Sequence, residues 1–583
     1  MKKVLVALAA LALGSSAAAQ AFVFPAKWYA SPAAEAKRGG TYRGSSISDY
    51  KTLNPFTTAE AGNIPQTISS AASGMFIFDV STGDYIPYMA ASYTVSPDKL
   101  VWTMNLRKGM KWSDGRAIVA DDFITTFKIH TDEDVGSNSF DSFFIDDKPI
   151  VIEKVDGDTI KAIFPKVAAD AIEILAYDPF PNHIFAPVYA SRGAAGIKAM
   201  WTLATPAAQI VSSGAFKFVS YRPGERATFE KNDFYGEWNK DSAGAALPYL
   251  DGRTIAIVGN TAAQLAAFLG GSLDVFTPPN ADALSQVKRA IDGGGLKAEL
   301  RPNIGAAASS SWIVWNWNRK SDPFKQKLFR DANFRRAMSH LSNRAAMVDI
   351  VFGGLAQPAY TSVYLPFTNW VSGNAKKFDY NQEAAKALLE KAGFSKKNAD
   401  GFLVNREGKV LEFDITTNAG NIQREQMSKI FSDEAKKIGV KANFKPIDFN
   451  SLVAQLTSNG DDRKFDAILL GLSGGGVIYP LASNVEPCTG NLHAFNTSGK
   501  CLEPWETQVT ALFSRGQQEL DTTKRIAIAK QIQDVQSQYQ AWVYLLSPNT
   551  HAAWTSRTKG EFARPLQNSV NGTRLVDTSW IVQ

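Results

Sequence analysis

The chain has little cysteine and little histidine, which limits the metal and redox chemistry that it can support. Among its 583 residues there are two cysteines and five histidines. The histidines are His130, His183, His340, His493 and His551. No two of them form an H-x-H or i, i+4 pair, and no C-x-x-C-H haem-attachment motif occurs. We therefore expect no cofactor and no metal held by protein ligands.

Long apolar runs and blocks of one charge are also missing. After the N-terminal residues no run of about 18 apolar residues occurs, so no transmembrane helix is expected. The chain has 62 lysines and arginines against 56 aspartates and glutamates, without a basic block. Nucleic-acid binding is therefore not indicated. With 45% hydrophobic residues, the chain is long enough for more than one core.

The N-terminus has the pattern of a secretory signal peptide. Two lysines precede an apolar stretch from Val4 to Leu13, which is too short to span a membrane. Small residues place the cleavage site between Ala19 and Ala21, so residues 1–21 are assigned as the signal. No cysteine lies near this junction. We expect an exported, soluble protein without a lipid anchor, periplasmic where the cell has an outer membrane.

The two cysteines, Cys488 and Cys501, lie 13 residues apart in a polar loop. In an exported protein such a pair predicts a disulfide. The alternative is a metal site that includes His493, which lies between them. That set would leave zinc one ligand short and contains no C-x-x-C pair.

Strand and helix patterns follow one another throughout the chain and predict a mixed α/β fold. Residues 93–106 predict a hairpin that turns at Ser96-Pro97-Asp98. Residues 254–258, 262–269 and 273–275 read as strand, helix and strand, which predicts a parallel pair.

The stretch from Leu106 to Phe123 is the most informative part of the sequence. Ser113-Asp114-Gly115 predicts a turn with a positive φ. Asp121 and Asp122 suit the first turn of a helix, where the helix dipole favours negative charge. This stretch resembles a signature of the solute-binding proteins of peptide- and nickel-type ABC importers (family 5).

Further segments resemble the same family in the same order, from about Arg38 to the region of Gly560. They are Gly39–Arg43, Ile77–Ala90, Ser213–Tyr235, Phe334–Arg344 and Phe465–Leu470. The resemblance implies a class II periplasmic binding protein-like α/β fold with two lobes and an additional domain inserted in the first lobe. The implied parts are lobe I (38–70, 207–300 and 548–583), the inserted domain (71–206) and lobe II (301–547).

The resemblance also implies a mechanism and partners. The lobes would close on a small ligand about a hinge near Val211–Ala215 and Ser547–Asn549. A monomer would then deliver the ligand to ABC permease subunits with their ATPases. Hinge closure around a ligand requires no bond chemistry.

One departure from the family concerns the ligand. Peptide-binding members carry an acid after the Phe-Asp strand, and this acid pairs with the α-amine of the peptide. Here Gly475 stands at that position, within a glycine-rich stretch whose backbone N–H groups suit a neutral or anionic ligand. Asp448 or Asp462 could supply the acid instead. We expect a peptide, with an oligosaccharide as the alternative and a nickel chelate less favoured.

The expected ligand contacts cluster in three places: the glycine-rich loop, a tryptophan-rich strand and the start of the inserted domain. They are Ser473, Gly474, Gly475, Gly476, Tyr479, Trp315, Trp317, Met75 and Phe76. Aromatic faces stack on sugar rings and peptide side chains, although structural packing is the alternative role for each tryptophan.

An enzymatic alternative comes from residues 471–475, which match G-x-S-x-G. In α/β-hydrolases this motif positions a nucleophilic serine, and Asp521 and His551 could complete a triad around Ser473. The glycines that follow oppose the helix that such a motif needs. We therefore expect no enzyme.

Overall fold

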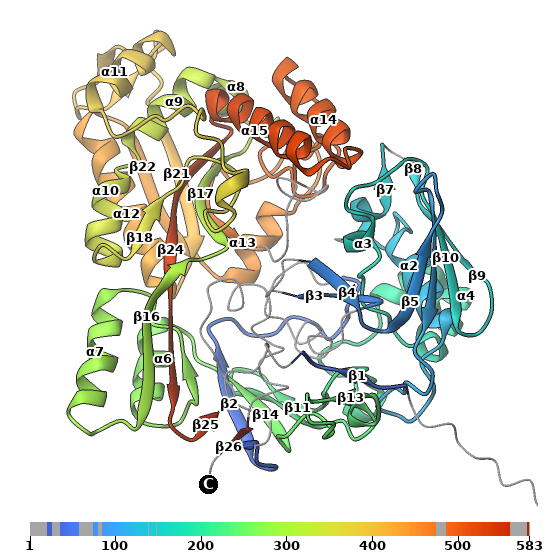
Figure 1. The fold of residues 1–583 in the computed structure, drawn as a ribbon. Helices are drawn as coiled ribbons and strands as arrows, with labels where there is room; N and C mark the ends of the chain where they lie inside the picture. Colours follow the sequence, from blue (N-terminus) through green and yellow to red (C-terminus); the bar gives the residue numbers. More distant parts are fainter. Residues whose placement is uncertain are drawn as a thin grey trace, which may run out of the picture.

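The computed structural model describes residues 20–25, 35–57, 74–79, 84–137, 139–146, 148–473 and 485–559, together with the backbone of 580–581. Sheets and helices of this part are arranged in the mixed α/β fold that the sequence predicts (Figure 1). Within it, no helix combines the length and the apolar character needed to cross a membrane. The predicted signal peptide lies outside the described residues, apart from its last two positions.

The largest sheet has eight strands and extends through the upper and lower left of Figure 1, in the order β15-β24-β17-β23-β21-β22, with β16 and β18 also paired to β24. Its strands are β15 (Val275–Phe276), β16 (Ala298–Ala306), β17 (Ser309–Trp315), β18 (Ala356–Pro358), β21 (Glu412–Asn418), β22 (Lys441–Ile447), β23 (Ala467–Ser473) and β24 (Trp542–Thr555). We call the part built around β17–β23 lobe II. The part built around β15, β16 and the sheet that contains β2 is lobe I.

Helices flank the sheet of lobe II. They are α8 (Pro323–Arg330), α9 (Ala332–Leu341), α10 (Arg344–Ala346), α11 (Gln382–Lys391), α12 (Ile422–Lys437), α13 (Phe449–Leu456), α14 (Pro504–Gln517) and α15 (Thr522–Tyr539). Helix α12 packs on β21 and β22, and α9 packs on β24. Asp521 accepts a hydrogen bond from the Lys524 N–H and so begins α15 as a helix separate from α14.

Lobe I contains a second sheet in the order β11-β12-β14-β2. Its elements are β2 (Thr41–Ser46), β11 (Phe216–Arg222), β12 (Arg226–Lys231), β14 (Gly252–Ile257), α6 (Thr261–Leu269) and α7 (Ala281–Asp292). The predicted parallel pairing across α6 is wrong. Strand β14 pairs in parallel with β2, whereas β15 joins the other sheet antiparallel to β24, so α6 connects two different sheets.

A third sheet, on the right of Figure 1, has the order β5-β6-β10-β9 and lies wholly within residues 71–206, which we call the inserted segment. Its elements are β5 (Ala90–Val95), β6 (Val101–Leu106), β9 (Val151–Lys154), β10 (Thr159–Ile163), α2 (Ala120–His130), α3 (Ala171–Ile174) and α4 (Asn182–Lys198). The predicted hairpin is confirmed, since β5 and β6 pair antiparallel around Ser96–Asp98.

Short strands complete the fold. They are β1 (Phe22–Val23), β3 (Phe76–Asp79), β4 (Asp84–Pro87), β7 (Phe144–Ile145), β8 (Lys148–Pro149), β13 (Asn239–Lys240), β19 (Lys396–Lys397), β20 (Leu403–Val404), β25 (Thr558–Lys559) and β26 (Trp580–Ile581).

Two stretches of chain pass side by side between lobe I and lobe II. Strand β24 pairs with β17 through residues 542–546 and with β16 through 549–555. The second crossing is the short connection from β16 to β17, where the Ala307 N–H donates to the Pro548 carbonyl (2.9 Å). The boundary predicted at residue 300 therefore falls inside β16.

Residues 211–215, predicted as part of the hinge, lead from the inserted segment into β11. The Ser212 N–H donates to Ser113 Oγ (3.0 Å), and the Ser113 N–H donates to the Ser212 carbonyl (2.8 Å). The predicted hinge at 547–549 does lie at a crossing. The stretch beside it there is 306–309, whereas 211–215 was predicted.

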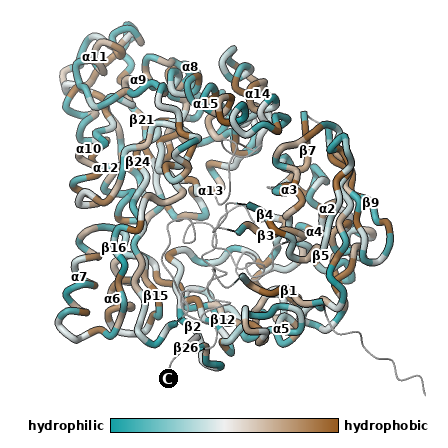
Figure 2. Tube along the Cα trace, in the orientation of Figure 1, coloured by the Kyte–Doolittle hydropathy of each residue, from teal (hydrophilic) through white to brown (hydrophobic). Residues whose placement is uncertain are grey.

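Apolar side chains form separate cores in these parts. One core unites the inserted segment with the β11-containing sheet, a second fills lobe II, and a small third core lies under α6 and α7. In Figure 2 hydrophobic segments accordingly recur in each of these regions. Separate cores allow the lobes to move relative to one another as units.

Candidate ligand-binding site

A polar edge of lobe II lies where three strands begin or end. Strands β21 and β23 run parallel, so Asn418 and Ser473 lie at the same edge of the sheet. Ser309 at the start of β17 is paired with Ser473. Helix α12 begins here, capped by Asn421. Ser473, the last residue of β23, is exposed.

Arg424, in the first turn of α12, lies over this edge. Its Nη1 donates to Asn418 Oδ1 (2.8 Å). A Cβ atom at Gly471 would lie only 3.2 Å from Arg424 Nη2, so the guanidinium also lies beside β23. Burial lowers the pKa of Arg424 to about 10. Within the described part of the chain, no carboxylate forms an ion pair with it.

The two lobes touch beside this edge. Gly420 precedes α12 and has a φ of +85°. A Cβ atom there would lie 2.5 Å from the carbonyl oxygen of Gly259, in the loop before α6 of lobe I. Only glycine fits at this position, because both the backbone conformation and the close approach exclude a side chain. The polar edge therefore faces lobe I at close range.

Lobe II also contacts the inserted segment directly. The Asn491 N–H donates to Asp141 Oδ2 (3.0 Å), and Gln518 Nε2 donates to Asp146 Oδ2 (2.8 Å). The Ala169 N–H donates to the Gln517 carbonyl (2.7 Å).

A cavity of about 400 Å³ lies at this second contact. Its lining comes from residues 140–146 of the inserted segment and from the disulfide loop and α14 of lobe II. Phe140, Phe144 and Phe513 give it apolar walls, and Thr489 and Thr510 add hydroxyl groups. Its volume falls within the range of small-molecule sites.

The predicted tryptophans lie in the core of lobe II. Trp315 and Trp317 are both fully buried. The ring of Trp315 packs edge-on against Phe334 and Phe413, and the Arg335 guanidinium lies over Trp317. This placement is that of structural packing, the alternative that the sequence left open.

Met75 and Phe76 are likewise fully buried, in the core shared by the inserted segment and lobe I. The carbonyl of Met75 accepts hydrogen bonds from Tyr88 and Ala90. Gly474, Gly475, Gly476 and Tyr479 lie outside the described residues. Among the predicted contacts, Ser473 is thus the one that the described part places exposed at the polar edge.

The two alternative acids do not lie free at this edge. Asp448 caps α13 by accepting from the Ser451 N–H (3.0 Å). Asp462 forms a backbone β-bridge with Arg319, beyond the Trp315 end of β17, and its carboxylate accepts from Ser321 and Lys464; Ser473 pairs with Ser309 at the opposite end of β17. Seven residues of strand separate the two ends by about 20 Å. Glu486, the first carboxylate after the loop, is buried and accepts from Gln536 of α15.

The possible serine triad is not assembled. Asp521 caps α15, and His551 Nδ1 accepts from the Asn303 N–H (2.8 Å). Among the described residues no hydrogen bond joins Ser473, Asp521 and His551 to one another. Within the described residues, the edge therefore offers binding groups and no activated nucleophile.

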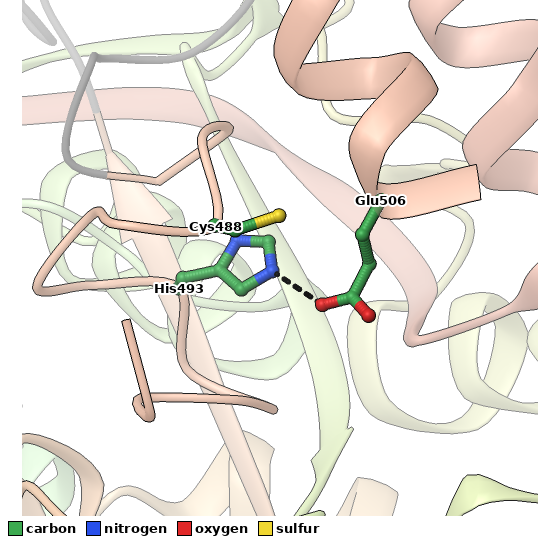
Figure 3. Close-up of side chains that lie close together, drawn as sticks. All are labelled: Cys488, His493 and Glu506. Atoms are coloured by element: carbon green, nitrogen blue, oxygen red, sulfur yellow. Dashed lines mark hydrogen bonds and ion pairs between the residues drawn. The ribbon is translucent and has the colours of Figure 1, made fainter. Parts of the chain in front are cut away.

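The predicted disulfide between Cys488 and Cys501 is confirmed, with the Cα atoms 5.2 Å apart. Cys488, His493 and Glu506 also come together (Figure 3). The sulfur is already bonded, His493 Nδ1 donates to the Val485 carbonyl (2.8 Å), and Nε2 faces Glu506 Oε1 (3.3 Å). Hydrogen bonds from His493 and Asn496 hold the pKa of Glu506 below its usual range, although burial opposes this. These contacts account for the cluster without a metal.

Arg424, Asn418 and Gly420 are not among the residues predicted from the sequence. From the sequence alone, residues 413–418 predict a strand and residues 423–438 predict a helix closed by Gly439, and neither pattern points to a ligand. A signal was available, because an arginine shortly after a strand end and a helix start lies near the carboxyl edge of a sheet.

Known proteins share this architecture. The profile of the bacterial extracellular solute-binding proteins, family 5 Middle, matches residues 84–484. A probable ABC transporter-binding protein of Deinococcus radiodurans is 47% identical over 100% of both chains.

Two solved structures have the same two-lobed fold at 22% identity. The oligopeptide-binding protein AppA from Bacillus subtilis, in complex with a nonapeptide, gives a TM-score of 0.76 over 94% of this chain and 100% of its own. The periplasmic binding protein MelB from Agrobacterium fabrum, in complex with stachyose, gives 0.81 over 96% of this chain and 87% of its own.

Proposed function

Because this chain belongs to the bacterial extracellular solute-binding proteins of family 5, we propose that it captures a peptide between its lobes and delivers it to an ABC permease with its ATPase subunits. The protein is exported through its N-terminal signal and acts as a soluble monomer. Its family consists of transporter binding proteins, and the proposed role is binding without catalysis.

The main support is the arrangement at the polar edge of lobe II. Ser309 and Ser473 present hydroxyl groups beside the place where Gly420 meets lobe I, at the edge where the buried Asn418 ends β21. Such groups can donate to and accept from a peptide backbone. A solute held there is enclosed from both lobes, which is the requirement for capture by closure.

The two chain crossings supply a route for opening and closing. Residues 547–549 and 306–309 are the stretches that join the two lobes around the large sheet. Rotation about a few residues at each crossing opens the polar edge while both cores stay intact. A ligand that contacts both lobes binds the closed form more tightly and shifts the population toward it.

A thermal-shift screen of the mature chain, from about Phe22 onward, tests the proposal. The probes are pooled peptides of two to eight residues, α- and β-linked oligosaccharides, and Ni²⁺ with chelators. A peptide present at 100 times its dissociation constant adds about 2.7 kcal/mol to the free energy of unfolding. We expect a shift with peptides. The peptide proposal fails if only another pool produces a shift, or if the protein consumes a peptide that it binds.

An oligosaccharide is the second candidate ligand. Gly475 replaces the acid that peptide-binding members use, and MelB, whose fold is similar, was solved with stachyose. A shift with oligosaccharides alone would assign the chain to this class.

A further inference from the structure

The side chains of Cys488, His493 and Glu506 form a compact cluster in lobe II that the proposed function does not use (Figure 3). A sulfur, a ring nitrogen and a carboxylate oxygen from these residues lie within 4.8 Å of one another, and all three residues are almost completely buried. The disulfide brings the sulfur of Cys501 to the same point. Glu506 thus supplies the fourth ligand that two cysteines and one histidine lack as a zinc site.

His493 and Glu506 are spaced like two ligands of one metal ion. His493 Nδ1 donates to the Val485 carbonyl (2.8 Å), so in the neutral ring Nε2 carries a lone pair. Nε2 faces Glu506 Oε1 at 3.3 Å, and two acceptors that face each other require a proton or a cation between them. A nitrogen and an oxygen that bind one tetrahedral zinc ion are about 3.3 to 3.5 Å apart. The observed distance therefore suits zinc as well as it suits the proton of an imidazolium.

Hydrogen bonds around the cluster hold both of these groups in position. The Val485 carbonyl fixes the ring of His493, as outer hydrogen bonds do for histidine ligands of zinc. Asn496 Nδ2 donates to Glu506 Oε1 (2.9 Å). The backbone N–H groups of Leu502 and Glu503 donate to Oε2 of the same carboxylate (2.9 and 2.8 Å). Only the two sulfurs would have to move in order to complete a metal site.

The sulfurs lie directly behind the wall of the cavity between lobe II and the inserted segment. Pro487 and Thr489, the neighbours of Cys488 in the chain, both line this cavity, and so does Thr510. The Thr510 hydroxyl lies 3.2 Å from Cys488 Sγ and 3.8 Å from Cys501 Sγ. Cys501 itself is only partly buried. A small reductant and a metal ion therefore have a short path to the cluster.

We propose that reduction of the disulfide converts this cluster into a zinc site. Its four ligands are the thiolates of Cys488 and Cys501, Nε2 of His493 and Oε1 of Glu506. A dithiol reductant gives up two electrons and two protons and leaves as its own disulfide, so that two thiols form. Each thiol releases its proton when its sulfur binds Zn²⁺, and the zinc replaces the proton on Nε2. With four protein ligands the site is closed, and it stabilises lobe II in place of the disulfide.

The test compares the disulfide-bonded mature chain with chain that was reduced by a dithiol and freed of it by gel filtration without oxygen. Both are titrated with Co²⁺, whose tetrahedral thiolate complexes absorb strongly in the visible and near ultraviolet, and then with Zn²⁺, which thiolate ligands favour. We expect one Co²⁺ per reduced chain with these bands, displacement by Zn²⁺, and no such bands from the disulfide-bonded chain. Zn²⁺ should also restore the melting temperature that reduction lowers.

His493→Gln and Glu506→Gln each remove one ligand and should weaken zinc binding by the reduced chain at least ten-fold. His340→Gln is the matched control, since His340 Nδ1 contacts the Asp379 carbonyl in lobe II, away from the cluster. Reduced wild type without thiolate bands overturns the inference, and so does unchanged affinity in His493→Gln and Glu506→Gln. X-ray absorption of zinc in reduced wild type decides the matter even if a variant does not fold. Two sulfur and two nitrogen or oxygen ligands are expected, and fewer than two sulfurs overturn the proposal.

Discussion

At the scale of single residues, Glu486 makes stability depend on pH in a direction that is unusual for an acid. Its side chain is buried, and burial raises its pKa to about 7 although Gln536 donates to it. Between the usual pKa of glutamate and 7 the folded chain therefore binds a proton that the unfolded chain releases. The free energy of unfolding then falls as pH rises through this window.

Glu486→Gln should remove this dependence, because glutamine can still accept from Gln536 and carries no charge. Relative to wild type, the variant gains roughly 3 kcal/mol between about pH 4.5 and 7. Urea unfolding at several pH values measures the difference in free energy of unfolding between the two proteins. The contributions of the other buried acids cancel in this difference, because both proteins contain them. A difference that stays constant across the window would contradict the assignment.

Single residues were predictable where local geometry determines their role. Gly115 has a φ of +86°, as its turn requires, and Asp122 lies in the first turn of α2, where it accepts from the Val119 N–H. Trp315 could not be assigned from its spacing, because strand alternation does not show which face of a sheet is covered by helices. Arg424 is recognisable only once β21 and β23 are known to be neighbours.

At the scale of elements, the loop closed by Cys488 and Cys501 stabilises lobe II. The loop supplies Asn496, whose amide donates to the buried carboxylate of Glu506 at the start of α14 (2.9 Å). Opening a loop of this length raises the entropy of the unfolded chain and costs about 3 kcal/mol in the loop-entropy model.

Replacing both cysteines with serine should lower the free energy of unfolding of lobe II by about that amount. Chemical denaturation followed by tryptophan fluorescence measures it, since lobe II contains Trp312, Trp315 and Trp317. A reducing agent should destabilise wild type equally and leave the double variant unchanged. Reduced wild type that unfolds at the same denaturant concentration as the oxidised form would refute the prediction.

Elements were predicted well where one segment contains its own signals and poorly where pairing partners are distant. Helix α12 ends before Gly439, which has a φ of +96°, and the hairpin around Ser96–Asp98 forms between neighbouring strands. The pairing of β14 and β15 failed because each strand finds a partner more than two hundred residues away, β2 for β14 and β24 for β15. Local sequence does not encode such partners.

At the scale of the whole molecule, capture depends on contacts that do not involve the ligand. The inserted segment and lobe II meet through Asp141, Asp146 and Ala169 on one side and Asn491, Gln517 and Gln518 on the other. If this contact between the inserted segment and lobe II forms when the lobes close, each of its hydrogen bonds stabilises the closed form. A typical hydrogen bond contributes about 1 kcal/mol, which corresponds to several-fold in affinity.

Gln518→Ala removes the bond to Asp146 without altering the polar edge, so it should weaken peptide binding several-fold, mainly through faster dissociation. Gln531→Ala is the matched control, because Gln531 accepts from Arg515 within lobe II and no hydrogen bond among the described residues joins it to the inserted segment. Stopped-flow fluorescence with a peptide from the screen measures both rates. Unchanged dissociation in Gln518→Ala would mean that this face is present in the open form as well, and closure would then occur only at Gly420 and the polar edge.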